Sequence, residues 1–383
     1  MPWREMNAVS NRLEFVRLAS QPGANKRELC RRHEISPKTG YKWLARHACG
    51  EGEEASLQDR SRRPLRCEQR SAPELEQAVV RLREEHRAWG GRKIARRLLD
   101  LGGPSVAPST VTSILHRHGL IHPEDTEQAA PIQRFEHAQP NALWQMDFKG
   151  TFATQAGPCY ALTMLDDHSR FNLALAANAR TTTAHVQPQL QAVFEQYGMP
   201  SRINVDNGPP WGAPGAVEHS LTDLGVWLIR NGITLSHSRP YHPQTNGKIE
   251  RFHRTLDKEL LSQHQFVDHP QVQRHFDRWR PIYNLQRPHE ALGMQTPVQR
   301  YRPSPFSFPR RLPSIEYLRG DTVVTVVANG VFKFNARTFK TSRALRGLPV
   351  ALRPRRDTDG CVDLFFCHQR LATLDLRDQP VET

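Results

Sequence analysis

The stretch WQMDFKG, residues 144–150, decides how the middle of this chain folds, because an acid interrupts an otherwise apolar, extended segment. Two further acids lie downstream: Asp206 follows an apolar run and precedes an Asn-Gly turn, and Glu250 lies early in a helical pattern. Hard divalent cations prefer carboxylate oxygens, and two such ions roughly 3.5–4 Å apart can drive phosphoryl transfer. We therefore expect Asp147, Asp206 and Glu250 to form a metal-binding catalytic triad.

The order of the elements around these acids narrows the choice of fold class. Residues 159–166 and 171–177 predict two more strands, and a helix follows before Asp206. This order resembles the ribonuclease-H-like catalytic core of retroviral integrases and of the allied bacterial insertion-sequence transposases, the DDE group. The flanking residues that carry the resemblance are DFKG (147–150), LDDHSR (165–170), DNGPP (206–210) and YHPQTNGKIERFHRTL (241–256). The resemblance covers residues 135–300 firmly and implies an α/β core with a mixed five-stranded sheet.

The resemblance also implies roles for single residues. The triad would hold two Mg²⁺ ions, with Mn²⁺ as a substitute, and neighbouring polar side chains would contact double-stranded DNA: His242, Asn246, Lys248, Arg254 and Lys258. A solvated histidine or a solvated helix face remains the alternative for these contacts. One departure is Asp257, because family members often carry a lysine at that position. Asp166 and Asp167 are expected to position a strand turn rather than to ligate metal.

The amino-acid composition indicates which kinds of partner to expect. A net charge of +14 over 383 residues indicates a polyanionic partner, and arginine, the more frequent basic residue, can fork onto phosphates and guanine edges. We see no long apolar segment and no signal peptide, so we expect no membrane partner and a bacterial cytoplasmic, nucleoid-associated location. The six cysteines form no C-x-x-C pair, which argues against structural zinc.

The amino-terminal third predicts two helix-turn-helix domains. The first spans residues 1–49, with helices over 7–19, 25–33 and 36–47; Ser36 is the expected N-cap of the third. That helix would present Lys38, Lys42 and Arg46 to DNA, as a recognition helix does. A small bundle for dimerisation is the alternative.

A basic linker over residues 50–70 leads to the second domain, residues 71–122. Its helices are predicted over three segments: 72–86, 91–99 and 109–118, the last capped by Ser109. The motif RAWGGRKIARRLL (87–99) resembles the second helix-turn-helix region of the same transposases, which implies that Arg92 and Lys93 contact DNA. A second linker over 123–138 precedes the catalytic core, residues 139–302.

The carboxy-terminal part changes character after a Pro-rich linker, residues 303–318. Short β-like runs and the turn signals Asn329-Gly330 and Asp359-Gly360 predict a small barrel over residues 319–383. The predicted strands are 322–327, 331–334, 350–352 and 362–366. The barrel resembles the SH3-like domain of integrases and phage-type transposases; a barrel with only a packing role is the alternative.

Taken together, the chain is predicted to be a multidomain α+β protein and, by resemblance, a DDE transposase. It would bind the inverted-repeat ends of an insertion sequence, nick them by two-metal hydrolysis and join the 3′-hydroxyl ends to target DNA. Holding two ends together implies a homo-oligomer, at least a dimer. A catalytically silent DNA-binding regulator derived from a transposase and a structure-selective nuclease are the alternatives.

Overall fold

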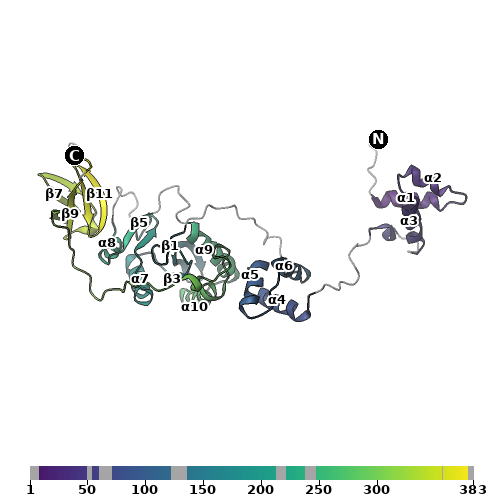
Figure 1. Ribbon diagram of the computed structural model, residues 1–383, viewed down its shortest axis with the longest axis horizontal. Coiled ribbons are helices and arrows are strands. Elements are labelled where there is room, and N and C mark those ends of the chain that lie inside the picture. Colours follow the sequence, from purple (N-terminus) through teal and green to yellow (C-terminus); the bar gives the residue numbers. More distant parts are fainter. Residues whose placement is uncertain are drawn as a thin grey trace. The chain divides into compact units, whose positions relative to one another are not determined.

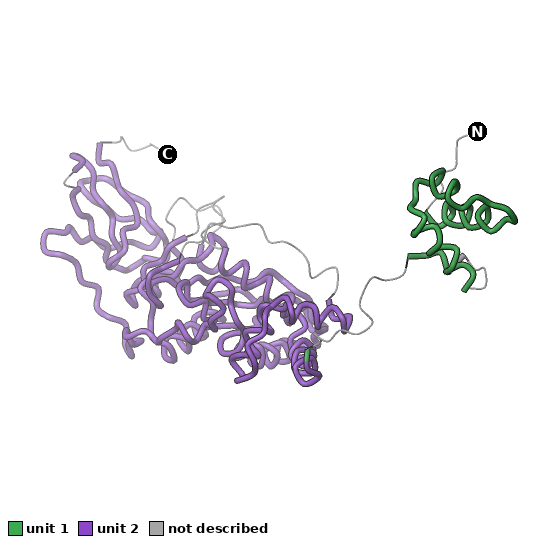
Figure 2. Tube along the Cα trace, turned by 45° about the vertical axis from the view of Figure 1, so that its right-hand side comes forward, with its two compact units in different colours: residues 1–71 green, residues 72–383 purple. Residues whose placement is uncertain are grey.

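A computed structural model of the chain describes residues 8–49, 54–59, 71–121, 136–212, 221–237, 247–355 and 357–377. Two compact units divide the chain, residues 1–71 and 72–383, and Figure 2 colours them separately. Each unit is described by itself. Within the described ranges, no helix has both the length and the apolar character needed to cross a membrane.

The first unit is a bundle of short helices, as predicted. Its helices are α1 (Ala8–Ala19), α2 (Lys26–Arg32) and α3 (Pro37–Cys49), followed by the 3-10 turn η1 (Glu54–Leu57). The Ser36 hydroxyl accepts a hydrogen bond from the Thr39 backbone N–H at 3.2 Å, which confirms the predicted cap of α3. The helices enclose a small apolar core made of Phe15, Val16, Ala19, Cys30, Trp43 and Leu57.

Gly40 allows α3 to lie close to α1 and α2. A Cβ atom at this position would meet the Cys30 Sγ at 2.5 Å and the Phe15 Cζ at 2.8 Å, and both side chains are buried. We expect Gly40→Val to destabilise this unit by about 1–3 kcal/mol through overpacking. Hydrogen exchange of the α1–α3 amides in the intact chain would measure the loss. The exposed Ala45→Val on the same helix is the matched control, and equal exchange in both variants would contradict the prediction.

The second unit begins with another three-helix arrangement, α4 (Pro73–Glu85), α5 (Gly91–Asp100) and α6 (Pro108–Arg117). A Cβ at Gly91 would lie 2.6 Å from the Pro108 carbonyl oxygen, so this glycine permits the close approach of α5 and α6. The prediction that Ser109 caps α6 is wrong. Ala107 is the N-cap, and Pro108, which has no N–H to satisfy, takes the first helical position.

A mixed five-stranded sheet forms the centre of the second unit, as the resemblance implied (Figure 1). Its strands are β1 (Trp144–Thr154), β2 (Gly157–Asp166), β3 (Asn172–Asn178), β4 (Arg202–Val205) and β5 (Thr234–His237), in the order β3-β2-β1-β4-β5. The pairs β1–β2 and β2–β3 are antiparallel, whereas β1–β4 and β4–β5 are parallel. The strand order places β1, with its acid, beside β4 at the centre of the sheet.

Helices cover both faces of this sheet. On one face, α7 (Thr183–Tyr197) and α8 (Asp223–Arg230) pack against apolar side chains such as Met146 and Leu162. On the other, α9 (Gly247–Glu259) and α10 (His269–Pro281) pack against Ala161 and Leu165 (Figure 1). This alternation follows the pleat, since successive strand residues point to opposite faces. Short elements complete the core: η4 (Leu261–Gln263), the π-turn η5 (Ile282–Gln286), η6 (Glu290–Leu292) and α11 (Pro297–Arg300).

Amide side chains cover both outer edges of the sheet. At the β3 edge, Gln273 of α10 accepts from the Ala177 N–H at 2.8 Å and donates to the Leu175 carbonyl at 3.2 Å. At the β5 edge, Gln369 accepts from the Leu235 N–H at 2.8 Å and donates to its carbonyl at 2.9 Å. Each glutamine therefore satisfies backbone groups that a further strand would otherwise pair.

The carboxy-terminal part folds into two small sheets. One contains β6 (Thr322–Thr325), β9 (Pro349–Pro354), β10 (Cys361–Phe366) and β11, which runs over Gln369–Asp375; the other is the hairpin of β7 (Val331–Phe334) and β8 (Arg337–Lys340). Among the described residues these sheets do not close into a barrel, so the predicted SH3-like barrel is not confirmed. The hairpin pairs only within itself, and apolar side chains beside it, such as Leu345, belong to the same cluster as Leu224 of α8.

Candidate active site

Strand register aligns the first two acids. In the parallel pairing of β1 with β4, Trp144 lies opposite Ile203 and Gln145 opposite Asn204. The same register, continued by two residues, brings Asp147 level with Asp206, which directly follows β4. The Gly208 N–H donates to the Asp206 Oδ1 at 3.1 Å, which holds this carboxylate in the turn. Glu250 is exposed and lies in the first turn of α9.

The pKa of Asp147 shows that the three acids share one neighbourhood. This pKa is raised from 3.8 to about 7, chiefly by burial and in part by the negative charges of Asp206 and Glu250, against a lowering contribution from the Phe148 N–H. The strand, the strand end and the helix therefore each bring an acid whose charge acts on Asp147 or belongs to it, and their role as a metal-binding triad stays a prediction. Like charges arranged in this way favour a proton or a cation between them.

These carboxylates offer the hard oxygen donors that Mg²⁺ prefers. In the described part of the chain, however, no three His, Cys, Asp or Glu side chains are gathered tightly enough to ligate one ion.

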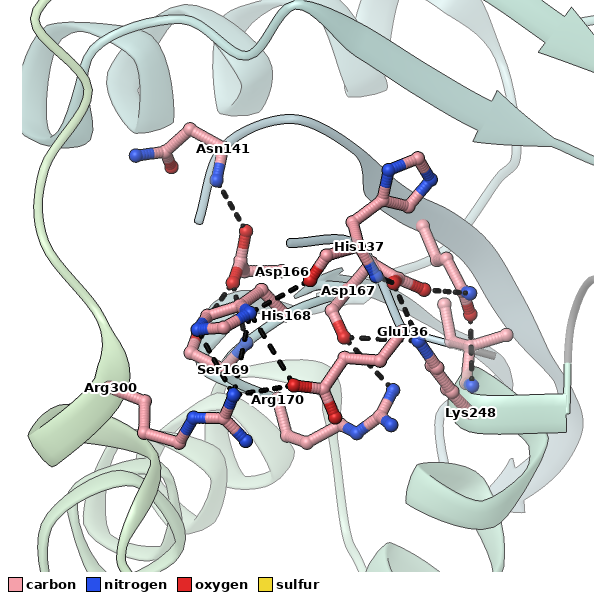
Figure 3. Close-up of polar contacts among 12 residues, drawn as sticks. Glu136, His137, Asn141, Asp166, Asp167, His168, Ser169, Arg170, Lys248 and Arg300 are labelled. Carbon is pink, nitrogen blue, oxygen red and sulfur yellow. Dashed lines mark hydrogen bonds and ion pairs between the residues drawn. The ribbon is translucent and has the colours of Figure 1, made fainter. Parts of the chain in front are cut away.

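Asp166 and Asp167 organise the turn after β2, as expected (Figure 3). Asp166 accepts from the Asn141 N–H at 2.7 Å and from the Ser169 hydroxyl at 2.6 Å. Asp167 accepts from the Gln145 amide at 2.9 Å and forms an ion pair with Lys248 at 2.5 Å. Lys248, predicted to contact DNA, therefore lies with its ammonium group against a buried carboxylate.

The other predicted DNA contacts near the acids lie in two situations. Arg254 and Lys258 are exposed on α9. His242 and Asn246 lie outside the described residues. The sequence did not single out the groups that hold α9 against the sheet, namely Lys149, Thr163 and His253. The sequence gives a signal for Lys149 alone. This residue follows Asp147 by two positions in a strand, and side chains two positions apart lie on the same face of a sheet.

The basic residues of the helical domains that were predicted to contact DNA differ in their surroundings. Lys38 and Lys42 are exposed on α3, and Lys42 and Arg46 lie over the Trp43 ring, at 4.7 Å and 4.9 Å from its centroid. On α5, Arg92 is exposed and forms an ion pair with Glu290 at 3.4 Å. The pKa of Lys93 is lowered to about 8, chiefly by burial and in part by the charge of Arg287. These two α5 residues therefore lie beside residues that follow α10.

Comparison with known protein families defines the class. Residues 137–243 and 231–297 match two family profiles, each described as an integrase core domain. Residues 6–57 and 39–115 match homeodomain-like domains, which agree with the two helix-turn-helix regions. With the mixed sheet and converging acids, these matches place the chain among proteins with an integrase catalytic core.

The carboxy-terminal part has a match of its own. Residues 321–382 match the carboxy-terminal domain of IS481 family transposases. The chain is therefore similar, part by part, to insertion-sequence transposases with an integrase core domain.

Two curated relatives and one solved structure are compared with the chain individually. The chain is 26% identical over 225 residues to the insertion element IS407 uncharacterized 31.7 kDa protein of Burkholderia multivorans, covering 58% of this chain and 78% of that protein. It is 27% identical over 229 residues to the IS476 uncharacterized 39.2 kDa protein of Xanthomonas euvesicatoria, covering 59% of this chain and 64%, less than two thirds, of that one. Among solved structures, a simian T-cell lymphotropic virus intasome chain aligns with 18% identity and a TM-score of 0.37, covering 77% of this chain and 99% of that chain.

Proposed function

We propose that this protein is a metal-dependent transposase that nicks the ends of its own insertion sequence and joins the freed 3′-hydroxyls to target DNA. The observation that supports the proposal is the strand register that brings Asp147 level with Asp206, together with the charges of Asp206 and Glu250 that act on the Asp147 carboxyl. The oxygen donors of the proposed site are carboxylates from three separate elements. Such donors suit Mg²⁺ or Mn²⁺ and phosphoryl-transfer chemistry.

Both reactions are in-line displacements at phosphorus. In nicking, a water oxygen forms the new P–O bond, the bond to the 3′-oxygen breaks, and that oxygen leaves as a 3′-hydroxyl. In joining, the 3′-hydroxyl oxygen attacks a target phosphodiester, and the displaced target oxygen takes up the proton. Asp147, Asp206 and Glu250 would hold the metal, which lowers the pKa of the attacking oxygen and offsets charge on the leaving one. The chemistry requires no covalent intermediate with the protein.

DNA recognition would rest on the helical domains and on the outer side of α9. Lys38 and Lys42 on α3 are exposed, as contacts with phosphates require, and Arg254 and Lys258 extend a basic surface next to Glu250. Joining two element ends implies at least two copies of the chain in the active assembly. Arg92 and Lys93 would serve DNA only after leaving their positions beside Glu290 and Arg287.

The test is a cleavage and joining assay. Purified full-length protein is incubated with labelled duplex taken from the nearest inverted repeats flanking the gene, with Mg²⁺, Mn²⁺ or EDTA. We expect nicked and joined products with either metal and none with EDTA, and a scrambled duplex serves as the matched control. Cutting without joining would favour a nuclease. Specific binding without cutting in either metal would favour a regulator and overturn the proposal.

A further inference from the structure

Three polar contacts connect α9 to the strand that carries Asp147. The Ile249 N–H donates to the Gln145 Oε1 at 3.2 Å. The His253 Nε2 lies 2.7 Å from the Thr163 hydroxyl oxygen, and that hydroxyl donates to the Asp147 carbonyl at 2.9 Å. The Lys149 ammonium lies 2.9 Å from the Asp257 Oδ1. We call these contacts the first, second and third rungs.

The rungs have matched spacing on the two elements. On β1 they fall at every second residue, which advances about 6.6–6.8 Å per step along a strand. On α9 they fall at every fourth residue, which advances about 6 Å per step along a helix. Both series ascend along the chain in the same direction. A shift of α9 by one residue would therefore break all three contacts together.

The second rung needs a neutral imidazole with a defined tautomer. Because the Thr163 hydroxyl gives its proton to the Asp147 carbonyl, the His253 Nε2 must donate to the hydroxyl oxygen. The pKa of His253 is lowered to about 3, chiefly by burial and in part by the charge of Lys149, so the ring is neutral near neutral pH. The histidine thus acts as a hydrogen-bond donor rather than as a cation.

The third rung is an ion pair between a mostly buried ammonium group and a half-exposed carboxylate. The Lys149 side chain is 15% exposed, and the Asp257 side chain is 50% exposed. Removing one partner of such a pair leaves the other charge poorly compensated, whereas exchanging the two partners keeps the attraction. Lys149 therefore reaches from the face of Asp147 to α9.

We propose that Lys149, Asp257 and His253 are positioning residues, which set the register of α9 and so place Glu250 opposite Asp147 and Asp206. This inference rests on the proposed function, because the register matters through the metal that the three acids would share. Glu250 directly follows the first rung and Asp147 belongs to the second. The positioning residues hold α9 in place, and the three acids would bind the metal.

A charge exchange tests the third rung. Lys149→Asp and Asp257→Lys alone should each raise the Mg²⁺ concentration for half-maximal nicking by about tenfold or more, the range for groups that orient metal ligands. The double exchange should return it to within about threefold of wild type. End binding is measured in parallel, because a lysine at position 257 adds to the basic surface of Arg254 and Lys258. Exchange of the exposed pair Arg355 and Asp357 is the matched control and should change nothing.

A conservative replacement tests the second rung. His253→Leu should raise the Mg²⁺ requirement to a similar extent, whereas His253→Gln, whose amide can donate to Thr163, should stay within about threefold of wild type. A merely structural role would lower the melting temperature without moving the metal requirement. The inference is overturned if the single variants keep the wild-type Mg²⁺ requirement, or if neither the double exchange nor glutamine restores it.

A readout without DNA separates this inference from the proposed function. The Mg²⁺-induced rise in melting temperature reports metal binding directly, so it is measured on wild type, the single variants and the double exchange. A smaller rise in the single variants that recovers in the double exchange supports the proposed role of these residues in the register of α9, even if the wild-type protein never nicks DNA. An equal rise in all variants counts against the register, whereas absent nicking by wild type counts only against the transposase.

Discussion

Asp206→Asn is expected to reduce nicking and joining by on the order of 10³-fold while leaving end binding near normal. The substitution keeps the shape of the side chain but removes the negative charge of one of the three carboxylates proposed to bind the metal. Loss of several kcal/mol of transition-state stabilisation, about 1.4 kcal/mol per tenfold in rate, gives this magnitude. The measurement is single-turnover cleavage of a labelled end duplex in Mg²⁺, with binding followed by gel shift.

Asp223→Asn is the matched control for that experiment. Asp223 is an exposed acid in the first turn of α8 and should tolerate the same change with little effect. Nicking by the Asp206 variant at the wild-type rate would overturn the assignment of the triad. Equal loss of cleavage and binding would show instead that the change disturbs the fold.

The second large effect concerns stability without metal. The pKa of Asp147 in the folded chain is about 7, well above its ordinary value of 3.8. Between those pH values the folded state holds a proton that the unfolded state has released. The contribution of Asp147 to the free energy of unfolding is therefore complete below about pH 4 and is lost as the pH rises towards 7. At pH 8 the accumulated loss is on the order of 2–4 kcal/mol, at about 1.4 kcal/mol per pKa unit.

Asp147→Asn should therefore stabilise the metal-free protein at pH 8 and change little at pH 4. Urea unfolding in EDTA at both pH values measures the difference. Saturating Mg²⁺ should remove the advantage of the variant, because the cation binds only the wild-type carboxylate set. Equal stability of the two proteins at pH 8 in EDTA would contradict the raised pKa.

Local patterns in the sequence predicted most of the architecture. The strand around Asp147, the turn at Asp206 and the Ser36 cap all depend on residues close together in the chain. Ser109 was misplaced because Pro108 competes for the same helix start. The carboxy-terminal strands were found, but barrel closure depends on pairing between distant segments, which a pattern of turns does not determine.

The candidate site was predictable to the level of the acids and no further. Lys93 and Lys248 carry charge that suggests DNA, yet tertiary contacts place Lys93 beside Arg287 and pair Lys248 with Asp167. His253 and Lys149 show the converse: their contacts join a strand to a helix about 100 residues later, so only the folded chain reveals them.

The covered sheet edges have a consequence for how copies of this protein meet. Because Gln273 and Gln369 occupy backbone groups at β3 and β5, they hinder extension of the central sheet into that of a neighbouring copy by strand addition. In the proposed assembly on DNA, copies would therefore meet through side-chain surfaces and the duplex between them. Separation of such copies would leave each central sheet intact.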